Sequence, residues 1–325
     1  YRTDGTMSVA AQNPRISDET LGRLLKLGSV ALVALLAFFI VFYVLTQRVD
    51  PGPSALDRTV TAAEQAVVKD PRNVAARMTL ASAYHQAGRL DESIAQYSEI
   101  LKVSKGNTDA LLARGQVYLE QSRTTEAAAD FTSIISAVKG GEFARIDERT
   151  AAAHYFLGTI LLKQGKPAEA AAEVQATLLT DPTDSDSFYV LGQAMSAQQK
   201  WSEAASAYLS ALRFVPTGWC EPYDGLQTAW GKLGQAPQAS YAGAMGQICR
   251  GDTATATTTL QGLTSGPMAA DALAGLGLAA ETTGDTKAAG DWYRKALAQD
   301  PKNENAAAGL NRVGTTSGLT TSASK

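Results

Sequence analysis

The sequence has little of what most catalytic and metal sites are built from. It contains two cysteines and two histidines in 325 residues, and the histidines, His85 and His154, lie far apart in the chain. It contains no P-loop and no Gly-x-Ser-x-Gly, His-Glu-x-x-His or Cys-x-x-Cys pattern. These absences count against catalytic, metal and cofactor sites, so we expect a protein that is not an enzyme and carries no metal or cofactor.

An excess of positive charge is also missing. Lys and Arg number 29 against 32 Asp and Glu, which gives a net charge of -3 at pH 7. Nucleic-acid-binding domains carry a basic patch or stripe, and the sequence shows none. Aromatic residues make up only 7% of the chain, and the heavy use of Ala in their place suits closely packed helices. The composition therefore predicts helices and excludes nucleic acid as a partner.

The longest apolar run lies near the N-terminus. Residues 27–47 (LGSVALVALLAFFIVFYVLTQ) contain no charged side chain, and as a helix they would be about 31 Å long, enough to cross a bilayer core of about 30 Å. A buried core helix is disfavoured because nothing interrupts the apolar surface. A cleaved signal peptide is disfavoured by the long polar leader and by the lack of an Ala-x-Ala site. We predict a retained, single-pass transmembrane helix.

Basic residues are more frequent just before this run than just after it. Three precede it and two follow it: Arg15, Arg23, Lys26, and then Arg48 and Arg58. By the positive-inside rule this bias places the N-terminus in the cytoplasm, with the rest of the chain periplasmic or extracellular. We expect residues 1–26 to form a polar tail and residues 48–55 a short Pro/Gly linker.

The rest of the chain repeats a pattern of two short helices with a period of about 34 residues. The pattern is clearest in residues 151–184. There a Leu-Gly pair lies in the first helix, a Gly in the turn, an Ala in the second helix and an Asp-Pro pair at its end: Leu157, Gly158, Gly165, Ala170, Asp181 and Pro182. Leu191 and Gly192 follow one period later. The pattern resembles the tetratricopeptide repeat (TPR) family.

The resemblance implies an all-α, right-handed solenoid of about six helical hairpins, each packed on its neighbours. It covers residues 56–313, with a lone helix at the start and a short closing helix over residues 304–313. Residues 314–325 are too poor in apolar side chains to fold, so we expect a disordered tail.

Three features depart from the pattern. Arg114 stands where a Leu is expected. Residues 136–150 contain an insertion, which is either part of a binding surface or a tolerated helix extension. After residue 236 the pattern loosens, and we interpret this part as a degenerate unit in which one helix serves two hairpins.

TPR first helices line a concave groove that holds an extended peptide or a helix. Carried over by register, this implies a set of groove residues: Met78, His85, Gln86, Leu112, Gln116, Tyr155, Thr159, Lys163, Tyr189, Gln193 and Asp224. These side chains are aromatic and amide-rich, with little charge. The tyrosines at 155 and 189 occupy equivalent positions, so we expect them to stack as neighbours, and Tyr is favoured at interfaces. The Lys/Asn/Arg set by which chaperone-binding TPR domains hold a terminal carboxylate is not evident.

The two cysteines lie in the loosened unit. Cys220 begins a first helix and Cys249 ends the antiparallel second helix, so both lie at the open end of one hairpin. Packed helices are about 8–10 Å apart, which lets facing cysteines reach disulfide geometry. We predict a disulfide, in agreement with an oxidising compartment; the alternative is two free, small core residues.

Two functions remain open at this stage, and both involve protein partners. The first is a membrane-anchored adapter or scaffold that binds a protein segment in its groove, in assembly or secretion at the outer side of a bacterial inner membrane. The second is a constitutive accessory subunit of a larger membrane complex, contacted through the transmembrane helix and the repeats. Small residues in the first part of that helix would permit close helix packing: Gly28, Ser29, Ala31, Ala34 and Ala37.

Overall fold

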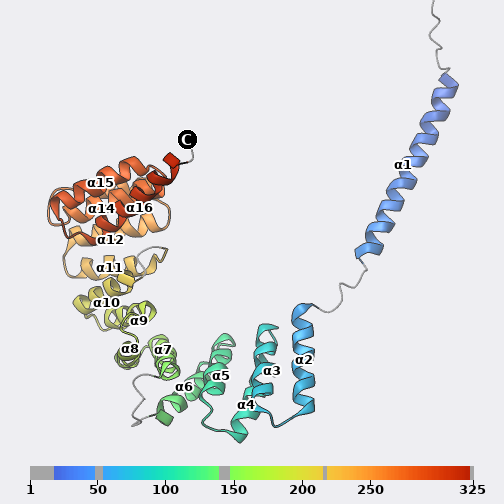
Figure 1. Cartoon of the computed structure of the whole chain (residues 1–325), viewed down its shortest axis with the longest axis horizontal. Coiled ribbons are helices and arrows are strands. Elements are labelled where there is room, and N and C mark those ends of the chain that lie inside the picture. Colours follow the sequence, from blue (N-terminus) through green and yellow to red (C-terminus); the bar gives the residue numbers. More distant parts are fainter. Residues whose placement is uncertain (1–17, 48–53, 139–146, 215–217, 323–325) are drawn as a thin grey trace, which may run out of the picture. The chain divides into compact units, whose positions relative to one another are not determined.

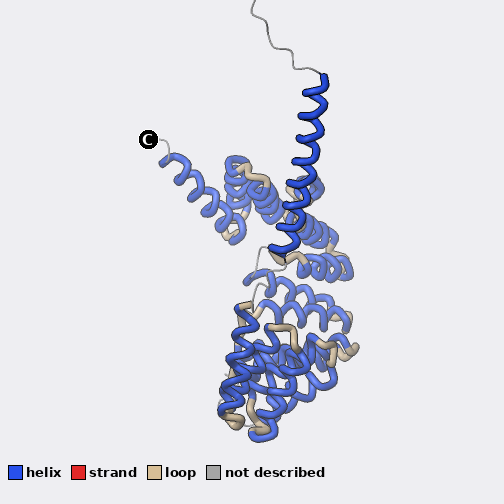
Figure 2. Tube along the Cα trace, turned by 90° about the vertical axis from the view of Figure 1, so that its right-hand side faces the viewer, coloured by secondary structure: helices blue, strands red, loops and turns tan. Residues whose placement is uncertain are grey.

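The described part of the chain is entirely helical. A computed structural model describes residues 18–47, 54–138, 147–214 and 218–322. Within these ranges there are sixteen α-helices and no strand (Figure 2), which confirms the predicted all-α fold. The chain divides into two units, residues 1–59 and 60–325.

The helices follow one another with short connections. In chain order they are α1 (Asp18–Gln47), α2 (Ala55–Lys69), α3 (Val74–Gln86), α4 (Leu90–Val103), α5 (Thr108–Glu120), α6 (Thr124–Val138), α7 (Glu148–Lys163), α8 (Pro167–Thr180), α9 (Ser185–Ala197), α10 (Trp201–Phe214), α11 (Glu221–Lys232), α12 (Ala236–Cys249), α13 (Thr253–Gly262), α14 (Ala269–Thr282), α15 (Thr286–Gln299) and α16 (Glu304–Ser322).

The first unit contains α1. Its segment Gly22–Val44 has a mean hydropathy of 2.7 and is 0% buried, so it is long and apolar enough to cross a membrane. The absence of burial is inconsistent with a core helix. A membrane span and a signal sequence both agree with this observation. The polar leader up to residue 17 and most of the proposed linker, residues 48–53, lie outside the described residues.

The second unit is a series of helical hairpins that pack side by side in chain order (Figure 1). A glycine recurs in the first helices α5, α7, α9 and α14 and allows these hairpins to close. A Cβ added at Gly158 would lie 2.7 Å from Val174 Cγ1, and one added at Gly192 would lie 2.6 Å from ring atoms of Tyr208. Gly165, in the turn between α7 and α8, has a φ of +75°, a conformation that glycine adopts without steric cost.

Short polar side chains determine where the first helices begin. Asn73, Asn107 and Asp147 each accept a hydrogen bond from a backbone N–H in the first turn of the helix that follows. Such caps satisfy donors that the helix itself leaves free. Because Asp147 caps α7, that helix begins at Glu148; residues 139–146 of the insertion lie outside the described residues.

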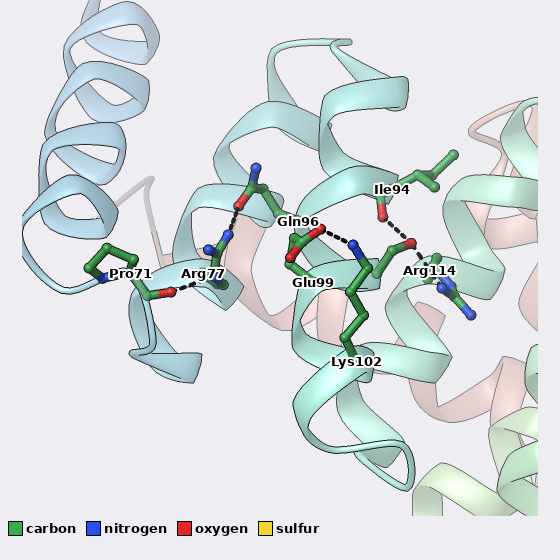
Figure 3. A network of polar contacts seen from close by, with 8 residues as sticks. Pro71, Arg77, Ile94, Gln96, Glu99, Lys102 and Arg114 are labelled. Carbon is green, nitrogen blue, oxygen red and sulfur yellow. Dashed lines mark hydrogen bonds and ion pairs between the residues drawn. The ribbon is translucent and has the colours of Figure 1, made fainter.

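The structure explains the arginine that replaces a repeat leucine. Arg114 donates hydrogen bonds to both carboxylate oxygens of Asp130, at 2.8 and 2.7 Å, and a third to Ser98 Oγ at 2.9 Å. The contact to Ser98 joins neighbouring hairpins (Figure 3). In the same network Arg77 donates to Pro71 O at 2.8 Å and to Gln96 Oε1 at 2.7 Å. Arg114 therefore replaces apolar packing with a largely buried, bidentate ion pair to Asp130.

The loosened unit is a hairpin of α11 and α12. Cys220 and Cys249 form a disulfide with a Cα–Cα distance of 5.6 Å, which joins the start of α11 to the end of α12. The latter helix packs against both α11 and α13. At the C-terminus, α16 extends to Ser322, beyond the closing helix predicted over residues 304–313 and into the tail that was expected to be disordered. Val313, where we expected the helix to end, is 6% exposed.

Candidate protein-binding groove

A hollow of about 640 Å³ is lined by the first helices α5 and α7, the end of α8 and the start of α9. Two of the predicted groove residues, Gln116 and Tyr155, line it. Its aromatic floor continues into the core, because the Tyr155 ring contacts Phe156 at 5.4 Å and Phe156 stacks on the buried Phe131 at 5.2 Å. The floor is therefore held in place by packing beneath it.

The rim of the hollow is acidic. Four carboxylates line it, and among the described residues no Lys or Arg does so: Glu148, Asp181, Asp184 and Asp186. The expectation of a groove with little charge is therefore wrong here. These acids lie at helix starts and in the turn after α8, outside the positions that the repeat register selects. Burial raises the pKa of Tyr155, and the negative charges of Asp186 and Asp184 raise it further.

Two of the four carboxylates have structural partners. Asp181 accepts from the backbone N and the Oγ1 of Thr183, at 2.9 and 2.7 Å. Asp184 caps α9 through the N–H of Asp186 at 3.2 Å. Glu148 and Asp186 are exposed, and in the described part of the chain neither carboxylate has a hydrogen-bond or ion-pair partner. These two are available to a ligand.

A second aromatic group lies one repeat further along. The ring of Tyr189 contacts Tyr208 at 5.9 Å and Trp219 at 5.0 Å, the latter edge-on. Burial raises the pKa of Tyr189, and Glu221 and Asp224 of α11 raise it further. Trp219 lies in the loop before α11, so the repeat register of first helices could not select it.

A family model decides the identity of the repeats. The model described as "Tetratricopeptide repeat" matches residues 56–108, 91–142, 112–185, 155–218 and 250–304. The chain belongs to the tetratricopeptide repeat family. TPR proteins are scaffolds for protein–protein interaction and are generally not enzymes. The stretch between the matches, residues 219–249, holds α11, α12 and the disulfide.

Several solved TPR structures are similar to this chain. A crystal structure of MamA is 19% identical, covering 56% of this chain and 94% of that one, with a TM-score of 0.49. A tetratricopeptide repeat protein from Parabacteroides merdae is 16% identical, covering 79% and 92%, with a TM-score of 0.47. YrrB, titled a TPR protein with an unusual peptide-binding site, is 16% identical, covering 76% and 96%, with a TM-score of 0.42. A search of curated proteins finds no match.

The TPR register places the remaining groove residues in different surroundings. Met78 and Leu112 are partly buried against the core of the first hairpins, whereas Lys163 is exposed. Asp224 forms an ion pair with Arg250. Within the described residues, Tyr155 and Tyr189 do not form the ring pair expected from their equivalent positions. Tyr155 contacts Phe156 of its own helix, whereas Tyr189 contacts Tyr208 and Trp219.

Polar contacts along the TPR first helices involve further members of the set. His85 Nε2 lies 2.6 Å from Glu120 Oε1, which links the ends of α3 and α5. Thr159 Oγ1 donates to Phe156 O at 2.7 Å, and the amide of Gln86 donates to Ser82 Oγ at 3.3 Å. The other histidine, His154, lies 2.6 Å from Glu173 Oε2 of α8, so it closes the α7/α8 hairpin.

Proposed function

We propose that the chain is a membrane-anchored TPR adapter that binds a segment of a protein partner along α5, α7, α9 and α11. The hollow on α5, α7 and α9 carries this proposal. Its volume of about 640 Å³ is that of a typical ligand site, and Tyr155, which forms its floor, is of a residue type enriched in binding hot spots.

The apolar helix α1 supports the anchor. Its exposed side chains include Leu27, Phe38, Phe39 and Phe42. Apolar side chains such as these are more stable in the hydrocarbon core of a membrane than in water. A tether of this kind raises the effective concentration of the repeats near membrane proteins. The disulfide fits repeats on the oxidising, outer side of a bacterial inner membrane, where the adapter would act in assembly or secretion.

The same proposal assigns the segments of the chain. Residues 1–26 are a cytoplasmic tail, residues 27–47 the membrane span, residues 48–55 a linker, residues 56–313 the TPR solenoid with its capping helices, and residues 314–325 a tail. Protease added to cells whose outer membrane has been opened should degrade the repeats and spare the N-terminal tail. An intact mass that lacks the first 40 or so residues would show a cleaved signal peptide instead.

Native pull-down from membranes, read out by mass spectrometry, tests the groove. Tyr155→Ala combined with Tyr189→Ala should abolish capture of the proteins that the wild-type chain retains, with unchanged helix content by circular dichroism. Leu179→Ala is the matched control, since Leu179 is an apolar side chain on a second helix and is 72% exposed. Equal capture by the groove variant and the control would rule the groove out.

A constitutive subunit of a membrane complex is the second candidate. It is favoured by the small residues of α1, since a Cβ added at Gly28 would meet no atom within 4 Å and a partner helix could approach closely there. A partner that stays stoichiometric through detergent extraction supports the subunit, and one that exchanges supports the adapter.

A further inference from the structure

The two groove tyrosines share the same surroundings. Tyr155 on α7 lies beside Asp184 and Asp186 at the start of α9. One repeat later, Tyr189 on α9 is under the negative charge of Glu221 and Asp224 on α11. In both cases an aromatic ring of one first helix is flanked by carboxylates of the next first helix. The chain therefore presents two successive subsites that each combine a tyrosine with carboxylates, although in the second Asp224 is paired with Arg250.

Three carboxylates of the first helices are already paired. Asp109 forms an ion pair with Arg149, Glu120 lies 2.6 Å from His85, and Asp224 pairs with Arg250. By contrast, Glu148, Asp186 and Glu221 border the two subsites and have no ion pair in the described residues. These three negative charges are left for a ligand to neutralise.

The second subsite has an aromatic wall next to the disulfide. Trp219 meets Tyr189 edge-on at 5.0 Å, and the next residue, Cys220, is bonded to Cys249. The disulfide therefore restrains the backbone one residue beyond Trp219. The two rings form an aromatic corner, and Glu221, two residues after Trp219, begins α11 beside it.

We propose that this face, from the hollow on α7 to the Tyr189–Trp219 corner, binds a positively charged protein segment that places one Lys or Arg side chain in each subsite. A cation is attracted to the face of an aromatic ring and forms charge-assisted hydrogen bonds with carboxylates. A metal cation is a poorer fit, since no group of three His, Cys, Asp or Glu in the described residues could hold one. This inference rests on the proposed function and specifies its partner.

The geometry also sets the spacing of the charges. The helices α7 and α9 are in contact, and helices in contact lie about 8–10 Å apart. An extended chain advances about 3.3 Å per residue, so a cationic residue at every third position would reach both subsites. This spacing defines a probe.

The experiment measures binding of synthetic peptides to the full chain in detergent, by isothermal titration calorimetry. The probe is an acetylated, amidated peptide of four Lys-Ser-Gly triplets, and the matched peptides carry Gln or Glu in place of Lys. We expect binding of the Lys peptide, with at least tenfold weaker binding of the Gln peptide and none of the Glu peptide. Equal binding of the Lys and Gln peptides would overturn the requirement for a cation.

Variants separate the subsites from net charge. Asp186→Asn combined with Glu221→Gln should weaken the Lys peptide at least tenfold, as should Tyr155→Ala combined with Tyr189→Ala. The control, Glu203→Gln with Glu304→Gln, removes the same charge from exposed positions on α10 and α16 and should change the affinity less than twofold. If the site and control variants lose the same affinity for the Lys peptide, binding depends only on net charge and the proposal is wrong.

Trp219 gives an independent signal. Binding of the Lys peptide should change the tryptophan fluorescence of the wild-type chain, and Trp219→Phe should remove that change. Failure of the Lys peptide to bind, alongside partner capture that still depends on Tyr155 and Tyr189, would refute the cationic segment and leave the proposed groove standing. Capture that is independent of both tyrosines would refute the groove itself.

Discussion

The hairpins α9/α10 and α11/α12 solve the same packing problem in opposite ways. In α9/α10 the first helix contributes Gly192 and the second contributes Tyr208, whose ring fills the space left by the missing side chain. At the same repeat positions one period later, α11 has Leu226 and α12 has Ala242, which are 1% and 0% exposed and share one core cluster. The large and the small side chain have exchanged helices. The volume between the helices is kept while the residue pattern is lost.

This exchange explains why the family model and the fold diverge here. The TPR matches stop at residue 218 and resume at residue 250, yet α11 and α12 pack as a hairpin between their neighbours. A family model scores each position separately, whereas packing depends on the summed volume of facing side chains. The disulfide adds a second, covalent restraint to the hairpin whose glycine–aromatic pair is missing.

Restoring the family glycine alone should break the second hairpin. We expect Leu226→Gly to destabilise α11/α12 by about 4–5 kcal/mol, because it leaves a cavity and removes a good helix former. Amide hydrogen exchange of α11 and α12 in the full chain measures this loss locally. The double variant Leu226→Gly/Ala242→Tyr re-creates the α9/α10 arrangement and should recover at least about 1 kcal/mol of coupling. If the changes in unfolding free energy of the two single variants simply add up in the double variant, the large and small side chains do not compensate for each other.

Removing the disulfide should have the next largest effect. Replacing both Cys220 and Cys249 with Ser should destabilise this hairpin by about 3–4 kcal/mol on the loop-entropy model. Hydrogen exchange should rise in α11 and α12 and stay unchanged in α7 and α8, which serve as the internal control. A uniform change across all hairpins would mean that the bond acts on the whole unit.

The repeat period predicted most of the fold, since Leu157, Gly158 and Gly165 with their equivalents determine where helices pack and turn. The position of the cysteine pair followed from the same register, because an antiparallel hairpin brings its two ends together. The acidic rim could not be predicted in this way: Glu148 and Asp186 lie in the first turns of helices, where acids also serve the helix dipole. Trp219 lies in a loop, and only the structure places it against Tyr189.

The hairpin α5/α6 contains another departure from the family pattern, Arg114 in place of a Leu, and Asp130 on the facing helix compensates for it. Arg114→Leu restores the family residue but leaves Asp130, whose side chain is 6% exposed, without its cation. We expect a loss of about 3 kcal/mol, the cost of an unpaired buried charge. Adding Asp130→Ala should recover most of the loss, because an apolar pair can replace a buried ion pair. Urea unfolding of the full chain in detergent measures the stability of both variants. If Arg114→Leu alone is as stable as the wild type, Asp130 does not depend on Arg114.

The smallest effect concerns the turn between α9 and α10, where Gln199 has a φ of +59°. The equivalent residue of the α7/α8 turn is Gly165, with a φ of +75°. A residue with a Cβ pays about 1–2 kcal/mol in this conformation, and glycine loses about 0.5–1 kcal/mol more than other residues in chain entropy on folding. Gln199→Gly should therefore stabilise α9/α10 by about 0.5–1 kcal/mol. Gln198→Gly is the control, because Gln198 has a φ of -85°. Glycine there brings the entropic cost and also removes the hydrogen bonds that the side-chain amide donates to Pro167 O and Ala194 O. Urea unfolding should shift the two variants in opposite directions. A shift in the same direction would mean that the turn is not strained, and that in this hairpin, unlike in α11/α12, a departure from the family residue needs no compensation.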